Sequence, residues 1–178
     1  MAVADGELTV QSKITPEIFR EFAYFDIFSH QKRWRGPVVF AFILTLAAAI
    51  VLSRADSTRG AGLLGGVLLT VGLGLPLVYF VNFFISVGKR ARMFTGTVVA
   101  YTVALGEEGV LVTKNGQNAL YPWDKVFRVY RLEESVALYV DPAHAFLLTG
   151  RLDSIWRRVA ARLPQEKCRE HFNRKSRQ

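Results

Sequence analysis

The sequence is poor in cysteine and, over two long stretches, has no charge. Cys168 is the only cysteine among 178 residues. A disulfide framework and a cysteine-based zinc site each need several cysteines, so both are excluded. Apolar residues make up 51% of the chain and charged residues 21%, which excludes an intrinsically disordered protein. Positive charge is in excess, because 23 Lys and Arg residues oppose 15 Asp and Glu residues, a formal net charge of +8. Such a charge is typical of proteins that bind nucleic acid or anionic membranes.

The two stretches without charged side chains are residues 36–53 and residues 60–88. A helix rises about 1.5 Å per residue and the hydrocarbon layer is about 30 Å thick. The first stretch reaches roughly 27 Å, which is enough if flanking residues snorkel, and the second is longer than a span needs. We therefore predict transmembrane helices over 36–53 and 60–88, joined by an external loop over 54–59. Buried helices of a soluble protein are the alternative, but two such runs are hard to bury in a chain of this length. A cleaved signal peptide is disfavoured because the first stretch starts too far from the N-terminus.

Basic residues gather just outside the predicted spans and are scarce between them. We expect these residues, with one tryptophan, to anchor the spans at the membrane interface: Lys32, Arg33, Trp34, Arg35, Lys89, Arg90 and Arg92. The loop holds only Arg54 and Arg59, with Asp56 between them. Because Lys and Arg favour the cytoplasmic side, this distribution predicts a two-pass protein with both termini in the cytoplasm. Neither span contains a charged residue, which argues against an ion pathway within the chain.

Small residues recur at four-residue spacing on both predicted spans. The rows are Gly62, Gly66, Thr70 and Gly74 on the second span, and Ala41, Thr45 and Ala49 on the first. Small residues let helix backbones approach closely in lipid, so we predict that these rows are helix-packing faces. The alternative is that Gly and Ala are simply common in membrane helices. The rows could pair within one chain or between chains.

Residues 1–35 form the segment before the first span. The alternation around Leu8 and Val10 hints at a strand. Residues 15–29 read TPEIFREFAYFDIFS and predict an aromatic-rich amphipathic helix, with Thr15 as N-cap and Pro16 at its first position. This helix could lie in the membrane interface or pack on the domain that follows. We favour packing because basic residues are sparse on it.

Residues 93–165 predict a separate domain rich in short strands. Val, Thr and Tyr residues recur in six segments bounded by turn residues, over 97–105, 110–113, 117–121, 125–132, 136–140 and 145–149. Asn115 and Gly116 are a strong hairpin signal because both tolerate a positive φ. A helix should then start near Asp153, a good N-cap, and end before Pro164. These elements predict a small antiparallel barrel or sandwich closed by one helix.

Four loosely defined motifs in this region resemble a known family. They are GEEGV at 106–110, YPWDKV at 121–126, VALYV at 136–140 and AFLL at 145–148, and ITPE at 14–17 precedes them. With the two spans, these motifs resemble the YcxB-like C-terminal domain of bacterial membrane proteins. The chain departs from the family pattern after Leu148, where Thr149, Gly150 and Arg151 replace a proline and two basic residues. The resemblance implies a pleckstrin-homology-like barrel at the cytoplasmic face of the bacterial inner membrane, and it implies no established activity.

Residues that could carry catalysis or hold a cofactor are hard to find. The three histidines lie in unrelated segments, and the Glu107–Glu108 and Glu133–Glu134 pairs occupy turns. No glycine-rich phosphate loop is present outside the second span. We therefore predict a protein without a catalytic residue, metal ion, cofactor or small-molecule substrate. Trp123 is expected to fill the core of the domain rather than face a ligand.

The basic charge near the C-terminus leaves more than one interpretation open. Residues 166–178 form a basic tail, and three arginines just before it are candidates for contact with lipid or a partner: Arg157, Arg158 and Arg162. The same region could simply be solvated. Nucleic-acid binding is disfavoured because the tail lacks interleaved aromatic residues. The sequence as a whole predicts a membrane-anchored, non-enzymatic module that contacts protein or anionic lipid. The alternative is an accessory subunit of a transporter or membrane-enzyme complex, with protein partners or self-association.

Overall fold

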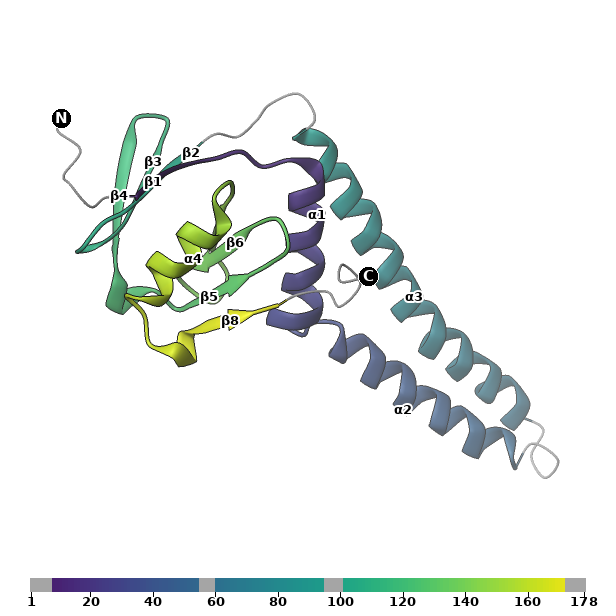
Figure 1. Ribbon diagram of the computed structural model, residues 1–178. Helices are drawn as coiled ribbons and strands as arrows, with labels where there is room; N and C mark the ends of the chain where they lie inside the picture. The colour runs from purple at the N-terminus through teal and green to yellow at the C-terminus, as the bar shows by residue number, and fades with distance from the viewer. Residues whose placement is uncertain (1–7, 55–59, 95–100, 172–178) are drawn as a thin grey trace, which may run out of the picture. The chain divides into compact units, whose positions relative to one another are not determined.

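The computed structural model describes residues 8–54, 60–94 and 101–171 (Figure 1). Residues 55–59 of the predicted loop, the start of the predicted strand 97–105 and the end of the predicted tail 166–178 lie outside the described residues. The chain divides into two units, one made of residues 23–90 and the other of residues 1–22 together with 91–178. The first unit is therefore an insertion in the sequence of the second.

Two long helices make up most of the inserted unit. They are α2 (Arg35–Leu52) and α3 (Ala61–Met93), which confirms two helices at the predicted spans. Both are long and apolar enough to cross a membrane, and only 6% and 11% of their most apolar 18-residue windows are buried. A core helix of a soluble protein would bury most of such a window. α3 continues past its predicted end at residue 88, and Pro76 lies inside it.

The seam between α2 and α3 uses small residues at positions next to the predicted rows. Ala48 is fully buried on α2. On α3, a Cβ added at Gly72 would lie 2.8 Å from the Cβ of Leu44, and one added at Gly65 would lie 2.5 Å from the Leu52 side chain. A Cβ added at Gly62, Gly66 or Gly74 would meet nothing within 4 Å. The predicted row of glycines therefore does not form the seam within the chain.

The first sheet of the larger unit has four antiparallel strands. They are β1 (Leu8–Ser12), β2 (Tyr101–Leu105), β3 (Gly109–Lys114) and β4 (Gln117–Pro122), paired in that order. The hint of a strand near residue 8 is confirmed, and β1 pairs with β2 although about ninety residues separate them. Asn115 and Gly116 have φ values of 51° and 76°, as the predicted hairpin requires.

The second sheet also has four strands, but one of them is parallel. β5 (Arg128–Arg131), β6 (Val136–Tyr139) and β7 (Ala145–Leu148) form an antiparallel meander. β8 (Cys168–Glu170) pairs in parallel with β5, so the order is β7-β6-β5-β8. The sequence predicts that these three residues belong to the basic tail, but they form part of the sheet.

Within residues 8–54, 60–94 and 101–171 neither sheet closes, so the predicted barrel is not found there. Pro122 ends β4, and a 3₁₀ turn, η3 (Trp123–Lys125), redirects the chain before β5 begins. β5 then pairs with β6 and β8, which occupy both of its edges. β4 and β5 consequently do not pair with each other. The fold is α+β, with two open sheets and helices.

The core of this unit is built from both sheets and from α4 (Leu152–Ala160). Its large side chains that are under 2% exposed are Val103, Leu105, Val110, Val126, Val129, Leu132, Val136, Leu138, Tyr139, Leu148, Ile155 and Val159. The Tyr101 hydroxyl crosses between the sheets and bonds both backbone groups of Leu147 at 2.7 Å. The predicted helix near Asp153 is confirmed, but Arg151 is its N-cap residue, and Asp153 instead pairs with Arg131 at 2.5 Å.

Helix α1 (Pro16–Phe25) follows β1, and a π-helical turn, η1 (Asp26–His30), follows α1. Thr15 caps α1, because its Oγ1 accepts a hydrogen bond from the Ile18 backbone at 3.3 Å. Within the larger unit, the rings of Phe22 and Tyr139 lie 6.1 Å apart. The Glu21 carboxylate accepts hydrogen bonds from the Glu133 and Glu134 backbone N–H groups at 2.7 and 3.4 Å. Residues 16–22 therefore pack on the strand-rich domain, as predicted.

Candidate functional site

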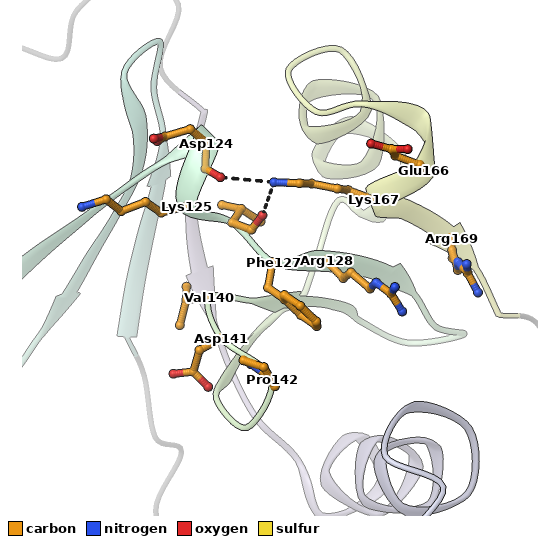
Figure 2. Close-up of a pocket in the computed structure, with 11 residues that line it drawn as sticks. Asp124, Lys125, Phe127, Arg128, Val140, Asp141, Pro142, Glu166, Lys167 and Arg169 are labelled. Atoms are coloured by element: carbon orange, nitrogen blue, oxygen red, sulfur yellow. Dashed lines mark hydrogen bonds between the residues drawn. The ribbon is translucent and has the colours of Figure 1, made fainter.

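The described part of the larger unit contains a pocket of about 640 Å³ (Figure 2). Three stretches of chain form its walls. The first is residues 124–128, from η3 into β5. The second is residues 140–142, in the turn between β6 and β7. The third comes from η4 (Gln165–Lys167) and β8. The pocket therefore exists because β8 is placed beside β5.

Lys167 connects the wall from η4 to the wall from η3. Pro164 begins a 3₁₀ turn that directs the Lys167 side chain back towards the start of β5. Its Nζ donates hydrogen bonds to the carbonyl oxygens of Val126 at 2.7 Å and Asp124 at 3.2 Å (Figure 2). An ammonium has three N–H groups, so one of them is left for another acceptor.

Phe127 and Arg128 belong to the first wall of the pocket. The Arg128 guanidinium carbon lies 5.4 Å from the centre of the Phe127 ring, a cation–π arrangement. Phe127 is 37% exposed, so part of its surface is accessible to a ligand. The stacking holds the guanidinium in place without using its N–H groups, which stay available as donors.

Asp141 organises the turn that forms the second wall. Its carboxylate accepts hydrogen bonds from the backbone N–H groups of Ala143 and His144, at 2.7 and 2.8 Å, and its other oxygen lies 2.7 Å from the His144 Nδ1. The Ala143 hydrogen bond is the largest cause that lowers the pKa of Asp141. The charge of this carboxylate is therefore shared among donors of its own turn.

Charge in the pocket is mixed, with a small basic excess. Four basic and three acidic side chains line it: Lys125, Arg128, Lys167 and Arg169, against Asp124, Asp141 and Glu166. Among the residues that the structure describes, Arg128, Lys167 and Arg169 form no ion pair with a carboxylate. The basic side of this pocket is thus available to an anion.

The arginines that the sequence analysis singled out do not line this pocket. Arg157 and Arg158 lie on α4, and the Arg157 Nε donates to the Asp153 carbonyl at 3.3 Å. Arg162 pairs with Glu107 at 3.3 Å. The sequence pattern places Arg128 only in a strand and does not single it out. It groups Lys167 and Arg169 with a basic tail that either contacts anionic lipid or is solvated. The pairing of β5 with β8 brings them together.

The predicted interface residues lie at the ends of the two long helices. Arg35 begins α2, and the Trp34 Nε1 just before it donates to the Phe28 carbonyl at 3.0 Å. The predicted anchors after the second span continue α3 beyond its apolar part: Lys89, Arg90 and Arg92. Within the same unit, the ring of Tyr24 lies 6.2 Å from Phe83 and 6.0 Å from Phe84.

Trp123 is a core residue, as predicted. Its side chain is buried, and its Nε1 donates to the Gly106 carbonyl at 3.1 Å. Metal binding has no candidate in the described residues, since no three His, Cys, Asp or Glu side chains gather there. The candidate site is therefore the pocket, and its chemistry is that of hydrogen-bond donors and positive charge.

Comparison with known proteins gives a match for the part of the chain that contains two of the pocket walls, at residues 124–128 and 140–142. Residues 105–154 match the family model of the YcxB-like proteins. This segment is similar to the YcxB-like proteins. The match confirms the resemblance inferred from the sequence, and it covers the chain from the end of β2 into α4. The third wall, at 166–169, lies beyond the matched residues. No curated protein and no solved structure matches the chain.

Proposed function

We propose that this protein is a membrane-anchored, non-enzymatic binding module whose YcxB-like domain contacts anionic lipid or protein at the cytoplasmic face of the bacterial inner membrane. The exposure of α2 and α3 carries the proposal. In water, two helices with so little of their apolar surface buried would drive aggregation, whereas lipid satisfies both the side chains and the helical backbone.

The distribution of basic residues supports the orientation. Lys32, Arg33 and Arg35 precede α2, and Lys89, Arg90 and Arg92 end α3. The positive-inside rule then puts both termini and the YcxB-like domain in the cytoplasm. Lys and Arg near an anionic leaflet each contribute about 1 kcal/mol of attraction.

The order of elements supports a pleckstrin-homology-like arrangement of the domain. A four-stranded meander, β1 to β4, is followed by a three-stranded meander, β5 to β7, and then by α4. In this proposal the two helices are inserted between the first and second strands of the domain, and β8 is an addition to the second sheet.

Labelling of introduced cysteines tests the orientation. A Cβ at Gly60 and at Gly36 would meet nothing within 4 Å, so both accept a cysteine in a C168S background. A membrane-impermeant maleimide added to intact spheroplasts should label G60C, and it should label G36C only after permeabilisation. Labelling of G36C in intact spheroplasts would contradict the proposed topology.

Purification of the tagged full chain from its native membrane in mild detergent tests the function. Mass spectrometry of the co-purifying lipids should show enrichment of anionic phospholipid over the total membrane extract. Recovery of the lipid mixture in its bulk proportions, without any protein partner, would contradict the binding-module proposal. A stoichiometric protein partner would favour the second candidate below.

An accessory subunit of a transporter or membrane-enzyme complex is the second candidate. It is favoured by the row of Gly62, Gly66 and Gly74, which stays open because the seam with α2 uses Gly65 and Gly72. The variant G66L/G74L fills this row without touching the seam. Loss of a co-purifying protein from this variant would favour the subunit, while an unchanged set of lipids and proteins would favour the free module.

A further inference from the structure

We infer that the pocket between η3, the β6–β7 turn and β8 binds a phosphate-bearing ligand through Arg128, Lys167 and Arg169. This inference rests on the proposed function and deepens it, since it names the chemical group that the domain contacts and the side chains that contact it. A phospholipid headgroup and a soluble phosphate compound present the same group, and the experiment below distinguishes them.

The first argument is the way Lys167 is held. Two backbone carbonyl oxygens, of Asp124 and Val126, accept hydrogen bonds from its Nζ, and no carboxylate neutralises it among the described residues. The carbonyls fix the ammonium at the pocket wall but remove none of its net charge. A half-buried, positioned ammonium of this kind is a ready partner for a phosphate oxygen.

The second argument is the register of the second sheet. Tyr130 of β5 pairs with Arg169 of β8, and side chains two residues apart on a strand point to the same face. Arg128 and Arg169 therefore project from the same face of the sheet, as diagonal neighbours on adjacent strands. Figure 2 shows both guanidinium groups on one side of the pocket. Two forks of N–H donors so placed suit the several oxygens of one phosphate.

The acidic residues of the pocket do not cancel these charges. The carboxylate of Asp141 is held by donors of its own turn. Figure 2 shows the Asp124 carboxylate pointing away from the Lys167 ammonium, although the Asp124 carbonyl contacts it. Glu166 is exposed to solvent, where water screens its charge.

The exposed ring of Phe127 adds an apolar surface next to the cations. Its stacking with Arg128 keeps that guanidinium in place before a ligand arrives, so less side-chain entropy is lost on binding. The ring also gives the glycerol or acyl part of a lipid an apolar contact. The pocket volume, about 640 Å³, is ample for a headgroup.

Paired variants of the full chain in mild detergent test the inference. R128Q/R169Q removes two pocket charges and leaves Lys167 to hold β8 in place. R157Q/R158Q removes the same charge from α4, away from the pocket, and is the matched control. Native mass spectrometry would measure the binding of phosphatidylglycerol, with phosphatidylcholine for comparison and inorganic phosphate as competitor. Circular dichroism would check that both variants are folded.

We expect R128Q/R169Q to weaken phosphatidylglycerol binding by about tenfold or more, while R157Q/R158Q stays near the unaltered protein. Competition by inorganic phosphate in the unaltered protein, but not in R128Q/R169Q, would support the inference and identify a soluble phosphate as a sufficient ligand. Absence of competition, with the loss on R128Q/R169Q retained, would support it and identify the lipid headgroup.

Two results would overturn the inference, and the first of them leaves the proposed function intact. If R157Q/R158Q weakens phosphatidylglycerol binding and R128Q/R169Q does not, lipid contact belongs to α4 rather than to the pocket. If the unaltered protein shows neither a preference for phosphatidylglycerol nor competition by phosphate, the inference also fails. The co-purification experiment then decides separately whether the module binds protein.

Discussion

At the residue scale, the buried hydroxyl of Tyr101 joins the two sheets of the larger unit. The Tyr101 hydroxyl donates to the Leu147 carbonyl and accepts from the Leu147 N–H, both at 2.7 Å. Burial is the main cause that raises the pKa of Tyr101 to about 12, from an ordinary value of 10.0. The side chain therefore stays protonated in the folded state at a pH where it ionises in the unfolded chain.

The variant Y101F should lower the free energy of unfolding by about 1–3 kcal/mol, because it leaves two backbone groups of Leu147 without a partner. In the unaltered protein, the stability linked to this group is fully present below pH 10, and it is lost as the pH rises through about 12. Y101F should lose that part of the pH dependence. Chemical unfolding in detergent, followed by circular dichroism between about pH 8 and 12, measures both effects.

The exposed Tyr24 provides the control, since it lies in the other unit and Y24F should change neither quantity. If Y101F keeps the alkaline slope of the unaltered protein, Tyr101 is not the group that links stability to pH in this range.

Glu21 is a second residue whose pKa is changed by its environment. Burial raises the pKa of its carboxyl, against the opposing effect of hydrogen bonds from Glu133 and Glu134. The carboxylate nevertheless ties α1 to the turn between β5 and β6. One acidic side chain on a helix thus contacts a turn more than a hundred residues later.

At the element scale, α2 and α3 approach each other at glycine. The nearest atom to a Cβ added at Gly72 is the Leu44 Cβ at 2.8 Å, and the next is the Leu44 carbonyl carbon at 3.6 Å. Leu44 Cβ is attached directly to the backbone and cannot rotate away. At Gly65 the nearest atoms belong to the end of the Leu52 side chain, which can move.

We therefore expect G72A to destabilise the helix pair by about 1–3 kcal/mol, through overpacking against Leu44. G66A, with nothing within 4 Å of the new Cβ, is the matched control and should be neutral or slightly stabilising, because alanine favours a helix more than glycine does. Thermal denaturation of the full chain in mild detergent measures the difference. Equal melting temperatures for the two variants would show that the helices do not meet at Gly72.

At the scale of the whole molecule, the domain is assembled from both ends of the chain. Residues 1–22 and 91–178 form one unit, and β1 pairs with β2 along its full length. Val10, Ser12, Ile14 and Ile18 from the N-terminal segment are all buried. The predicted domain over 93–165 therefore lacks an edge strand and a helix that belong to its fold.

A fragment of residues 93–178 should not unfold cooperatively, because losing β1 and α1 exposes the apolar surface that they cover. A fragment that joins residues 1–22 to 91–178 through a flexible Gly/Ser linker restores both elements and should unfold in one cooperative transition. Differential scanning calorimetry compares the two. A cooperative transition of 93–178 alone, at the temperature of the linked fragment, would contradict this account.

Patterns that are local in the sequence were enough to place most elements. The uncharged runs located α2 and α3, since the bilayer's thickness alone demands about twenty apolar residues in a row. Asn115 and Gly116 located the β3–β4 hairpin because few other residues accept a positive φ. Thr15 and Pro16 located the start of α1 for a similarly local reason.

Whatever depended on pairing between distant segments was decided by the tertiary structure. Whether the strands closed into a barrel depended on which strand took each edge of β5, and a three-residue segment at 168–170 took one of them. Such a short segment has no periodicity to reveal it, and its charge made it read as a solvated tail. The pocket and its cations, Arg128, Lys167 and Arg169, follow from that one pairing. The spacing of glycines likewise indicated close helix packing. Gly65 and Gly72 contact α2, whereas Gly66 and Gly74 do not. The sequence of α3 could not decide between them, because a packing face depends on the neighbouring helix as much as on the helix itself.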